Sequence, residues 1–420
     1  VQTKTTKFYQ LLLRRELFRD NDEKERIGSC SCQLEKGLPR NTEIDITYSM
    51  VDGTISFTVS YTSKGKQINE KTLLIFDEVQ EVPKALTSLK YFYENAPQYA
   101  IVAAGSLLGV ALHQGTSFPV GKVDFLDLYP LNFREFLCAM GEKQFVSMLD
   151  SCDTQMVTVF KTKYIERLRE YYFVGGMPEV VKDFSEKKDY NRVRAIQKNL
   201  INYYQQDFSK HAEIKLVPRL NLVWNSIPMQ LAKENKKYIY GQVREGSRAK
   251  DFELAIQWLL DCGLIHKVQR IQKPDLPLKA YIDFDSFKLF LVDIGLLIAM
   301  TDLDAKVIIE GNKIFTEFKG SLTEQYILQQ LISDVGVIPY YYSTQNSKGE
   351  IDFLVQGKTS VIPIEVKAEE NLKAKSLKAF CEKYQPSYAV RTSMSDYREQ
   401  DWMTNIPLYA IKWIENYVNQ

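Results

Sequence analysis

The sequence has no long apolar run, few histidines and no concentration of cysteine, and each lack excludes a class of protein. No stretch approaches 18 consecutive apolar residues, and the N-terminus lacks the basic patch and apolar core of a secretion signal. The three histidines lie far apart, and the six cysteines are scattered except for Cys30 and Cys32, so no spacing fits a structural zinc site. We therefore expect a soluble, cytoplasmic protein with reduced thiols and no zinc.

An excess of charge of either sign is also lacking. The 420 residues include 54 Lys or Arg and 53 Asp or Glu, a net charge of +1, so no global field directs the protein to nucleic acid or to a membrane. Any basic face must be local. Hydrophobic residues make up 45% and charged residues 25% of the chain, the balance of a folded protein with several cores.

Residues 71–150 predict an α/β sheet domain after an atypical N-terminal segment, residues 1–70. In that segment the runs ITYSM and TISFTVSYT flank an Asp-Gly turn and predict a β-hairpin. The apolar runs LLIF and AIVAA are typical of strands covered on both faces, and a helix beginning at Pro83 joins them into a βαβ unit. Asn132, with Glu135 three residues later, predicts the capped start of the next helix.

The remaining chain divides into three regions by pattern. Residues 151–215 predict a helical linker, interrupted by the turn-forming cluster GGMP. Residues 216–300 carry two helices and then the strand-like runs LIHKVQRI and YIDF, which predicts a winged-helix-like domain. Residues 305–420 alternate helices and strands and predict a separate small α/β domain. The fold class is therefore α/β, with a parallel sheet in the first domain and a helical and winged-helix-like middle.

Two adjacent acids, Asp77 and Glu78, follow the strand LLIF, at the edge where open α/β sheets bind ligands. In a nucleotide site Asp77 would hold Mg²⁺ through its water shell, and Glu78 would polarise the water that attacks the γ-phosphate. Ser106 ends the next strand, where it would sense that phosphate. The alternatives are two solvated acids and a simple turn at Ser106.

Acids also recur near the C-terminus. Alternate residues of a strand share a face, so Glu365 and Lys367 in IPIEVK point together, and IDFLV exposes Asp352 on a strand joined to it by a short turn. Glu324 falls on the apolar stripe of the helix LTEQYILQQLI, where an acid needs a partner. Glu350 is either a supporting acid or a solvated one.

Several dozen residues, in order, resemble a P-loop ATPase of the AAA superfamily, the bacterial and archaeal type with a winged-helix region and a C-terminal nuclease-like domain. The stretches that carry the resemblance include DEVQEVPKALTSLKYFYENAP, AAGSLLGVALHQGTSFPVGKVDFLDLYPLNFREFL, FVGGMPEVV and IPIEVKAEENLKAKSLKAF. The resemblance implies ATP and Mg²⁺ as cofactors, with Asp77 as a metal ligand. It also places Lys122 where the family often has an arginine facing phosphate.

The family's Walker A loop is missing from the sequence. Nowhere ahead of Asp77 does GxxxxGK followed by Ser or Thr occur, although glycine N–H groups and a lysine normally cradle the phosphates. The run VQTKTTKF carries Lys4, Thr5 and Thr6 like the end of that motif, with Thr3 in place of its glycine. We therefore expect a P-loop region that is altered or missing, and weak binding of ATP.

The last hundred residues resemble the PD-(D/E)XK nuclease fold, also described as restriction-endonuclease-like. The resemblance implies Asp352 and Glu365 as metal ligands, and Lys367 as the group that orients water or stabilises the transition state. It implies Glu324 as a helix-borne helper. The chemistry would be metal-assisted phosphodiester hydrolysis. The alternative is an exposed ion pair between Glu365 and Lys367 without a site.

Basic residues gather in the winged-helix-like region, as DNA binding requires. They are Lys233, Lys236, Lys237, Arg244, Arg248, Lys250, Lys267, Arg270 and Lys273. Acids on the second helix dilute this set, so a solvated face is the alternative. Trp224 and Trp258 are expected in the core rather than as platforms for bases.

These observations predict an ATPase coupled to a nucleic-acid-directed domain, with DNA or another nucleic acid as partner, no membrane, and an oligomer left open. Two alternatives remain. One is a non-hydrolysing binding or scaffold protein that lacks a working P-loop, and the other is an ATP-independent, metal-dependent nuclease.

Overall fold

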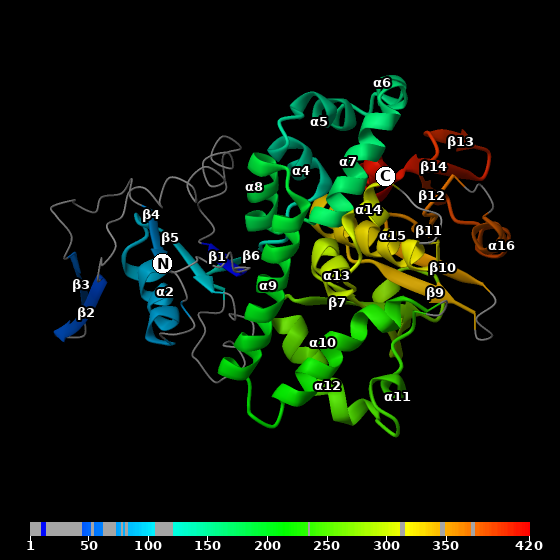
Figure 1. The fold of residues 1–420 in the computed structure, drawn as a ribbon. Helices are drawn as coiled ribbons and strands as arrows, with labels where there is room; N and C mark the ends of the chain where they lie inside the picture. Colours follow the sequence, from blue (N-terminus) through cyan, green and yellow to red (C-terminus); the bar gives the residue numbers. More distant parts are fainter. Residues whose placement is uncertain are drawn as a thin grey trace. The chain divides into compact units, whose positions relative to one another are not determined.

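The computed structural model describes residues 10–13, 44–51, 54–61, 73–76, 79, 83–105, 121–233, 236–310, 316–344, 349–370 and 374–420. Contacts divide the chain into two compact units, one of residues 9–128 and one formed mainly by residues 129–420 (Figure 1). The finer domain boundaries expected from the sequence stay predictions. Among the described helices, none is both long enough and apolar enough to cross a membrane.

The first unit contains the βαβ arrangement that the apolar runs predict. Strand β4 (Leu73–Phe76) pairs in parallel with β5 (Ala100–Gly105), and helix α2 (Pro83–Asn95) connects them. The core of the unit joins the two strands to one face of the helix. It contains Leu74, Val79, Leu86, Leu89, Phe92, Ile101 and Ala103. The prediction of this unit is confirmed.

The four-stranded sheet of this unit is mixed rather than wholly parallel. Its order is β4–β5–β1–β6, and β1 (Gln10–Leu13) runs antiparallel to both β5 and β6 (Asp124–Asp127). The expectation of a parallel sheet therefore holds only for the pair β4–β5. A four-residue apolar run such as QLLL predicts burial but carries no signal of strand direction, so the sequence could not indicate how it pairs.

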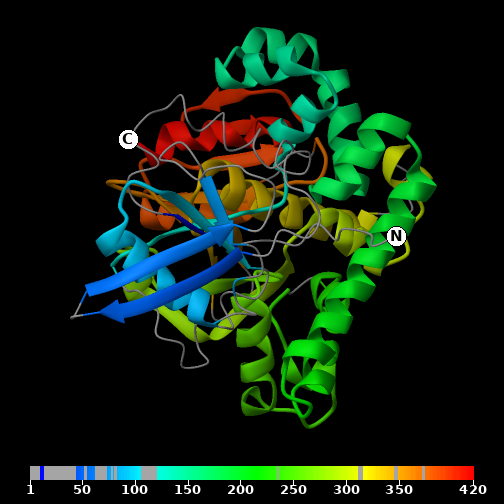
Figure 2. The same cartoon turned by 90° about the vertical axis from the view of Figure 1, so that its left-hand side faces the viewer.

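The expected hairpin is also present. Strands β2 (Ile44–Val51) and β3 (Thr54–Tyr61) are antiparallel, in a register that pairs Val51 with Thr54. Figure 2 shows them as two long adjacent arrows in blue. The Asp-Gly turn between them lies outside the described residues.

The second unit begins with a run of helices. Helix α4 (Phe133–Ala139) has the predicted capping box, since the Asn132 side chain accepts from the Glu135 N–H and Glu135 accepts from the Asn132 N–H, each at 2.9 Å. The helices that follow are α5 (Lys143–Asp150), α6 (Thr154–Val159), α7 (Lys161–Val174), α8 (Pro178–Lys187) and α9 (Tyr190–His211). The cluster GGMP separates α7 from α8, as predicted.

The middle of this unit has the order of helices and strands that the sequence predicts. The elements are α10 (Val217–Leu231), α11 (Tyr240–Val243), α12 (Ala249–Asp261), β7 (Ile265–Ile271), η3 (Leu278–Tyr281), β8 (Ile282–Leu291), α13 (Ile294–Met300) and α14 (Ala305–Ile309). Strands β7 and β8 form an antiparallel ribbon. Trp224 and Trp258 are buried, which confirms their place in the core.

The ribbon continues into the C-terminal sheet. Strand β7 pairs in parallel with β9, at Arg270 opposite Tyr341, and the eight strands have the order β13–β14–β12–β11–β10–β9–β7–β8 (Figure 1). The further elements are α15 (Thr316–Gln330), η5 (Leu331–Val335), β9 (Tyr340–Ser343), β10 (Glu350–Gln356), β11 (Val361–Val366), α16 (Lys375–Tyr384), β12 (Val390–Ser393), β13 (Arg398–Gln400), β14 (Met403–Pro407), η6 (Leu408–Ile414) and α17 (Glu415–Val418). The ribbon of β7 and β8 and the C-terminal strands therefore share one mixed sheet.

A buried carboxylate ties three segments of this unit together. Asp293, fully buried at the start of α13, accepts from the Gly176 N–H at 2.6 Å and from the Leu296 N–H at 3.1 Å. Gln329 of α15 donates to the same carboxylate at 3.2 Å. Burial raises the pKa of Asp293 to about 6, although these donors favour the charged form. The turn between α7 and α8 is thereby held against α13 and α15.

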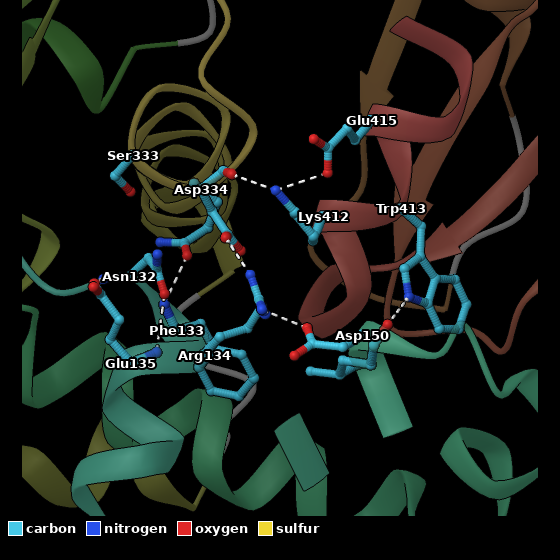
Figure 3. Close-up of polar contacts among 12 residues, drawn as sticks. Asn132, Phe133, Arg134, Glu135, Asp150, Ser333, Asp334, Lys412, Trp413 and Glu415 are labelled. Atoms are coloured by element: carbon cyan, nitrogen blue, oxygen red, sulfur yellow. Dashed lines mark hydrogen bonds and ion pairs between the residues drawn. The ribbon is translucent and has the colours of Figure 1, made fainter. Parts of the chain in front are cut away.

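A second polar junction joins α4 to the C-terminal elements (Figure 3). Arg134 lies between Asp150 and Asp334, with its guanidinium 2.8 Å from the Asp334 carboxylate. Lys412 of η6 donates to the Asp334 carbonyl at 2.8 Å. Burial would lower the pKa of Arg134, but the two carboxylates raise it, so the guanidinium stays charged.

The close approach of the Gly176 backbone to the Leu131 backbone gives a test of this fold. A Cβ added there would lie 2.1 Å from the Leu131 carbonyl oxygen and 2.9 Å from the Leu131 nitrogen, and neither backbone atom can move aside cheaply. We expect Gly176→Ala to lower the free energy of unfolding by at least about 2 kcal/mol. The urea concentration at the midpoint of unfolding measures this loss of stability. Gly320→Ala, inside α15 with open space around the added Cβ, is the control and should gain up to about 1 kcal/mol. Equal midpoints for the two variants would contradict the packing.

Candidate functional site

The nucleotide edge of the first unit is described only in part. The parallel pairing of β4 with β5 brings their carboxyl ends to one edge, as a nucleotide site of this kind needs. Asp77, Glu78 and Ser106, which follow those strands, lie outside the described residues, as do Lys4, Thr5 and Thr6. Their roles stay predictions.

Lys122 is the one predicted phosphate contact that the structure describes. Its ammonium lies 3.5 Å from the Glu94 carboxylate and 4.7 Å from the centre of the Tyr93 ring. A cation in this position is balanced by an acid of its own unit. Binding phosphate there would require Lys122 to leave Glu94 or to share its charge between the two anions.

The C-terminal acids are brought together by strand register. Strands β10 and β11 pair antiparallel with Phe353 opposite Ile364, and one further step places Asp352 opposite Glu365. The Asp352 carboxylate accepts from the Val366 N–H at 2.7 Å, which fixes it at this end of the ladder. Opposite residues of an antiparallel pair share a face, with Cβ atoms about 5 Å apart. Strand β10 is irregular between Ile351 and Leu354, however, and the two carboxylates have different neighbours, since Glu365 contacts the start of α16 and Asp352 lies near Glu324 of α15.

Glu365 is not part of an exposed ion pair. Its side chain is only 5% exposed, whereas that of Lys367, 2.6 Å from its carboxylate, is 30% exposed. The other carboxylate oxygen of Glu365 accepts from the Leu377 N–H, in the first turn of α16, at 3.2 Å. The carboxylate is thus fixed in place by contacts with both Lys367 and the start of α16. The solvated pair considered from the sequence is therefore not what forms.

Glu324 lies on the buried stripe of α15, as its spacing predicts, together with Leu328 and Leu331. One carboxylate oxygen, Oε1, is ion-paired with Lys236. The other, Oε2, lies 3.6 Å from the Lys288 ammonium, and the carboxylate also forms a side-chain hydrogen bond with Asp352.

Lys288 is a member of the site that the sequence analysis missed. It lies on β8 with its side chain fully buried, 2.5 Å from the Glu350 carboxylate and 4.8 Å from the centre of the Tyr341 ring. Glu350 is therefore ion-paired rather than simply solvated. A lysine inside the apolar run of β8 was the available signal, because a buried ammonium requires a carboxylate partner.

The acids of this cluster divide by charge state. Burial and the neighbouring Glu324 raise the pKa of Asp352 to about 7, although Lys288 and Lys236 oppose this shift. Burial would also raise the pKa of Glu324, but Lys236 and Lys288 lower it, so Glu324 is ionised. The pKa of Lys288 is raised by its carboxylate neighbours against the effect of burial. At neutral pH Asp352 is thus the group that exchanges its proton.

The described acids form no preformed cage for a divalent cation. Within the described ranges, no group of three or more His, Cys, Asp or Glu has the spacing of a metal centre. Glu365 is engaged by Lys367 and by the Leu377 N–H, and Glu324 by Lys236. Mg²⁺ commonly takes one or two protein carboxylates and keeps waters in its remaining positions. A metal ion at Asp352 and Glu365 therefore stays a prediction.

Several basic residues considered for DNA binding are already engaged. Arg270 pairs with Asp283 at 2.5 Å, and Lys273 with Asp275 at 2.6 Å. Lys267 lies over the Phe287 ring, 4.3 Å from its centre. These residues do not form a free basic face, and nucleic-acid binding stays a prediction.

The raised pKa of Asp352 predicts a pH-dependent stability. A carboxyl whose pKa is higher in the folded than in the unfolded chain stabilises the fold below about pH 4, and this contribution is lost as the pH rises to about 7. We expect Asp352→Asn to be more stable than the unmodified protein at pH 8, by roughly 2 to 4 kcal/mol, and nearly equal to it at about pH 4. Urea midpoints at the two pH values measure the difference. A gain of the same size at both would show that the charge of Asp352 is not the cause.

Three sequence families match successive parts of the chain. An AAA domain matches residues 4–137, and two domains of unknown function, DUF8612 and DUF4143, match residues 165–307 and 319–411. No curated protein and no solved structure gave a match. The chain therefore carries an N-terminal AAA domain, which implies a P-loop NTPase region, followed by two domains of unknown function.

Proposed function

We propose that the chain is an ATPase-type protein with a nucleic-acid-directed, nuclease-like C-terminal domain, acting in the cytoplasm. One observation carries the second half of this proposal. Asp352 lies opposite Glu365 on adjacent strands, with Lys367 beside Glu365 at 2.6 Å. This is the arrangement of two carboxylates and a lysine that metal-assisted phosphodiester hydrolysis uses. In this proposal the sheet is restriction-endonuclease-like and the middle region is winged-helix-like.

In the proposed site a divalent cation would be held by Asp352 and Glu365, where it would offset the charge that develops on a phosphate. The chain's own groups have distinct tasks. Asp352, whose pKa is raised to about 7, would be one of the residues that hold such an ion, in its deprotonated form. Lys367 is more exposed than Glu365, so it can face the substrate and orient water or stabilise developing negative charge. Glu324 supports the cluster from α15.

The ATPase part of the proposal is supported by the AAA match, which favours a nucleotide site at the edge of β4 and β5. Asp77 would be the ligand of Mg²⁺, Glu78 would polarise water, and Ser106 and Lys122 would contact phosphate. A second function is favoured by two observations. The sequence holds no Walker A motif ahead of Asp77, and Lys122 is paired with Glu94. These favour a binding or scaffold protein that does not hydrolyse ATP.

The C-terminal site is tested by separating metal binding from cleavage. Asp352→Ala should lose both the binding of Mn²⁺ and any cleavage of DNA or RNA, since it removes a ligand. Lys367→Ala should keep Mn²⁺ within about threefold of the original affinity and lose cleavage, because an ammonium group does not ligate a cation. Calorimetry and gel assays with single-stranded, duplex and branched substrates measure the two effects. Metal binding without cleavage of any substrate would favour a binding role.

The nucleotide site is tested by titration with MgATP. We expect weak binding, well above micromolar dissociation constants, because the glycine cradle and its lysine normally supply most phosphate contacts. Micromolar binding that is lost in Asp77→Ala would show that another segment replaces the loop. In that case Glu78→Gln should keep ATP binding and abolish turnover. Unchanged turnover would remove Glu78 from the mechanism.

A further inference from the structure

The second unit contains a groove between helices α9 and α10 and the end of α13, with a volume of about 720 Å³. Among its described lining residues, Phe318 alone falls outside the match to DUF8612 at residues 165–307. Volumes of about 300 to 1,000 Å³ are typical of sites that bind ligands. The groove is therefore a candidate binding site in a domain of unknown function.

Apolar side chains form much of the groove wall. Ile201 of α9, Met229 of α10 and Met300 of α13 all contribute to it. Met229 is 44% exposed, although methionine is among the residues most often buried. Unbranched, polarizable methionine side chains adapt to their partners and are common at binding surfaces. This wall favours an occupant that brings apolar side chains.

The described lining residues carry no net charge. The charged side chains among them are Lys198 of α9 and Asp302, which follows α13. Their ammonium and carboxylate groups lie 2.7 Å apart, so each charge offsets the other. A charged group entering the groove would lose water without gaining a free counter-ion. Electrostatic complementarity therefore favours an uncharged occupant.

The groove also presents side-chain amides. Asn202 of α9 makes no side-chain hydrogen bond with the described part of the chain. Gln205 donates to Asn225 across the groove wall at 3.5 Å, which is long for a hydrogen bond. This contact leaves the Gln205 amide oxygen and the Asn225 amide N–H groups for another partner. Donors and acceptors are thus both offered to an occupant.

A proline adds a further acceptor on α10. Pro228 lines the groove from inside this helix and has no N–H, so the Trp224 carbonyl one turn earlier lacks its usual helical donor. Amides and a carbonyl of this kind complement backbone N–H and C=O groups. A helix satisfies those groups internally, whereas an extended chain presents them to a partner. An extended segment therefore suits the groove better than a helix.

We propose that this groove binds an extended, uncharged peptide segment of a partner protein. Apolar side chains of the segment contact Met229 and Met300, and its backbone N–H and C=O groups bond to the three amides of the groove. In this proposal the DUF8612 region recruits another protein to the chain. The proposal goes beyond the nuclease-like site and does not depend on a metal ion or on ATP.

The first test is a selection of short random peptides, displayed on phage, against the immobilised full chain. Uncharged peptides that contain apolar residues should be enriched, because the groove offers apolar contacts and amides but no free charge. The most enriched peptide, made with a fluorescent label, should bind the chain in a polarisation assay. Enrichment of charged peptides, or of no peptide, would overturn the proposal.

Variants of exposed residues then locate the binding site. Met229→Lys places a charge in the groove and should weaken binding of the selected peptide at least about tenfold. Asn202→Ala removes one amide and should weaken it about threefold to tenfold. Leu254→Lys on α12 and Asn199→Ala on α9 alter exposed residues outside the groove lining, so these matched controls should bind the peptide unchanged. Thermal unfolding checks that each variant is folded, and equal binding by all four would refute the site.

Salt and a competing strand distinguish a peptide from a nucleic acid in the groove. Binding of the selected peptide should change by less than about twofold between about 50 and 200 mM salt, because no phosphate charges are neutralised. A single-stranded DNA oligonucleotide should not displace it. Displacement by the oligonucleotide, with loss of oligonucleotide binding in Met229→Lys, would make the groove a nucleic-acid site and refute the proposal.

Discussion

The second unit depends on the carboxylate of Asp293. Three segments far apart in sequence donate hydrogen bonds to it, from Gly176 in the turn between α7 and α8, from Leu296 in α13 and from Gln329 in α15. A buried charge is costly, and its pKa of about 6 shows that the donors offset only part of the cost. The glycines are needed because any side chain at 176 would prevent this approach. Since α15 also carries Glu324, this interaction sets the place of the site's helix.

The candidate site follows the same rule that buried charge must be matched. Lys288 on β8 meets Glu350 and Glu324, and Glu365 is held by Lys367 and by the start of α16. Asp352 is pushed toward its neutral form, because burial and the neighbouring Glu324 raise its pKa to about 7. An acid left in this state by its surroundings is the group most responsive to an added cation, and it lies opposite Glu365. The electrostatics and the strand register therefore select the same residue.

Much of this arrangement follows from local sequence patterns. The capping box at Asn132, the break at GGMP and the hairpin strands have the predicted form because short-range backbone preferences determine them. The pairing of Asp352 with Glu365 was accessible because two strands and a short turn fix the register. The antiparallel β1, the bond between β7 and β9, and Lys288 were missed, since each depends on a partner far away in the chain.

The pairing of β7 with β9 has a consequence for the independence of the two C-terminal regions. Because Arg270 and Tyr341 are neighbours in one sheet, a fragment beginning near residue 305 would leave the edge of β9 without its hydrogen-bonding partner. It would also leave Glu350 without its ammonium. An open edge of apolar tyrosines invites self-association, and a stranded buried acid loosens the strand that carries it. Each region therefore completes the other, one by closing a strand edge and the other by supplying the carboxylate that a buried ammonium needs.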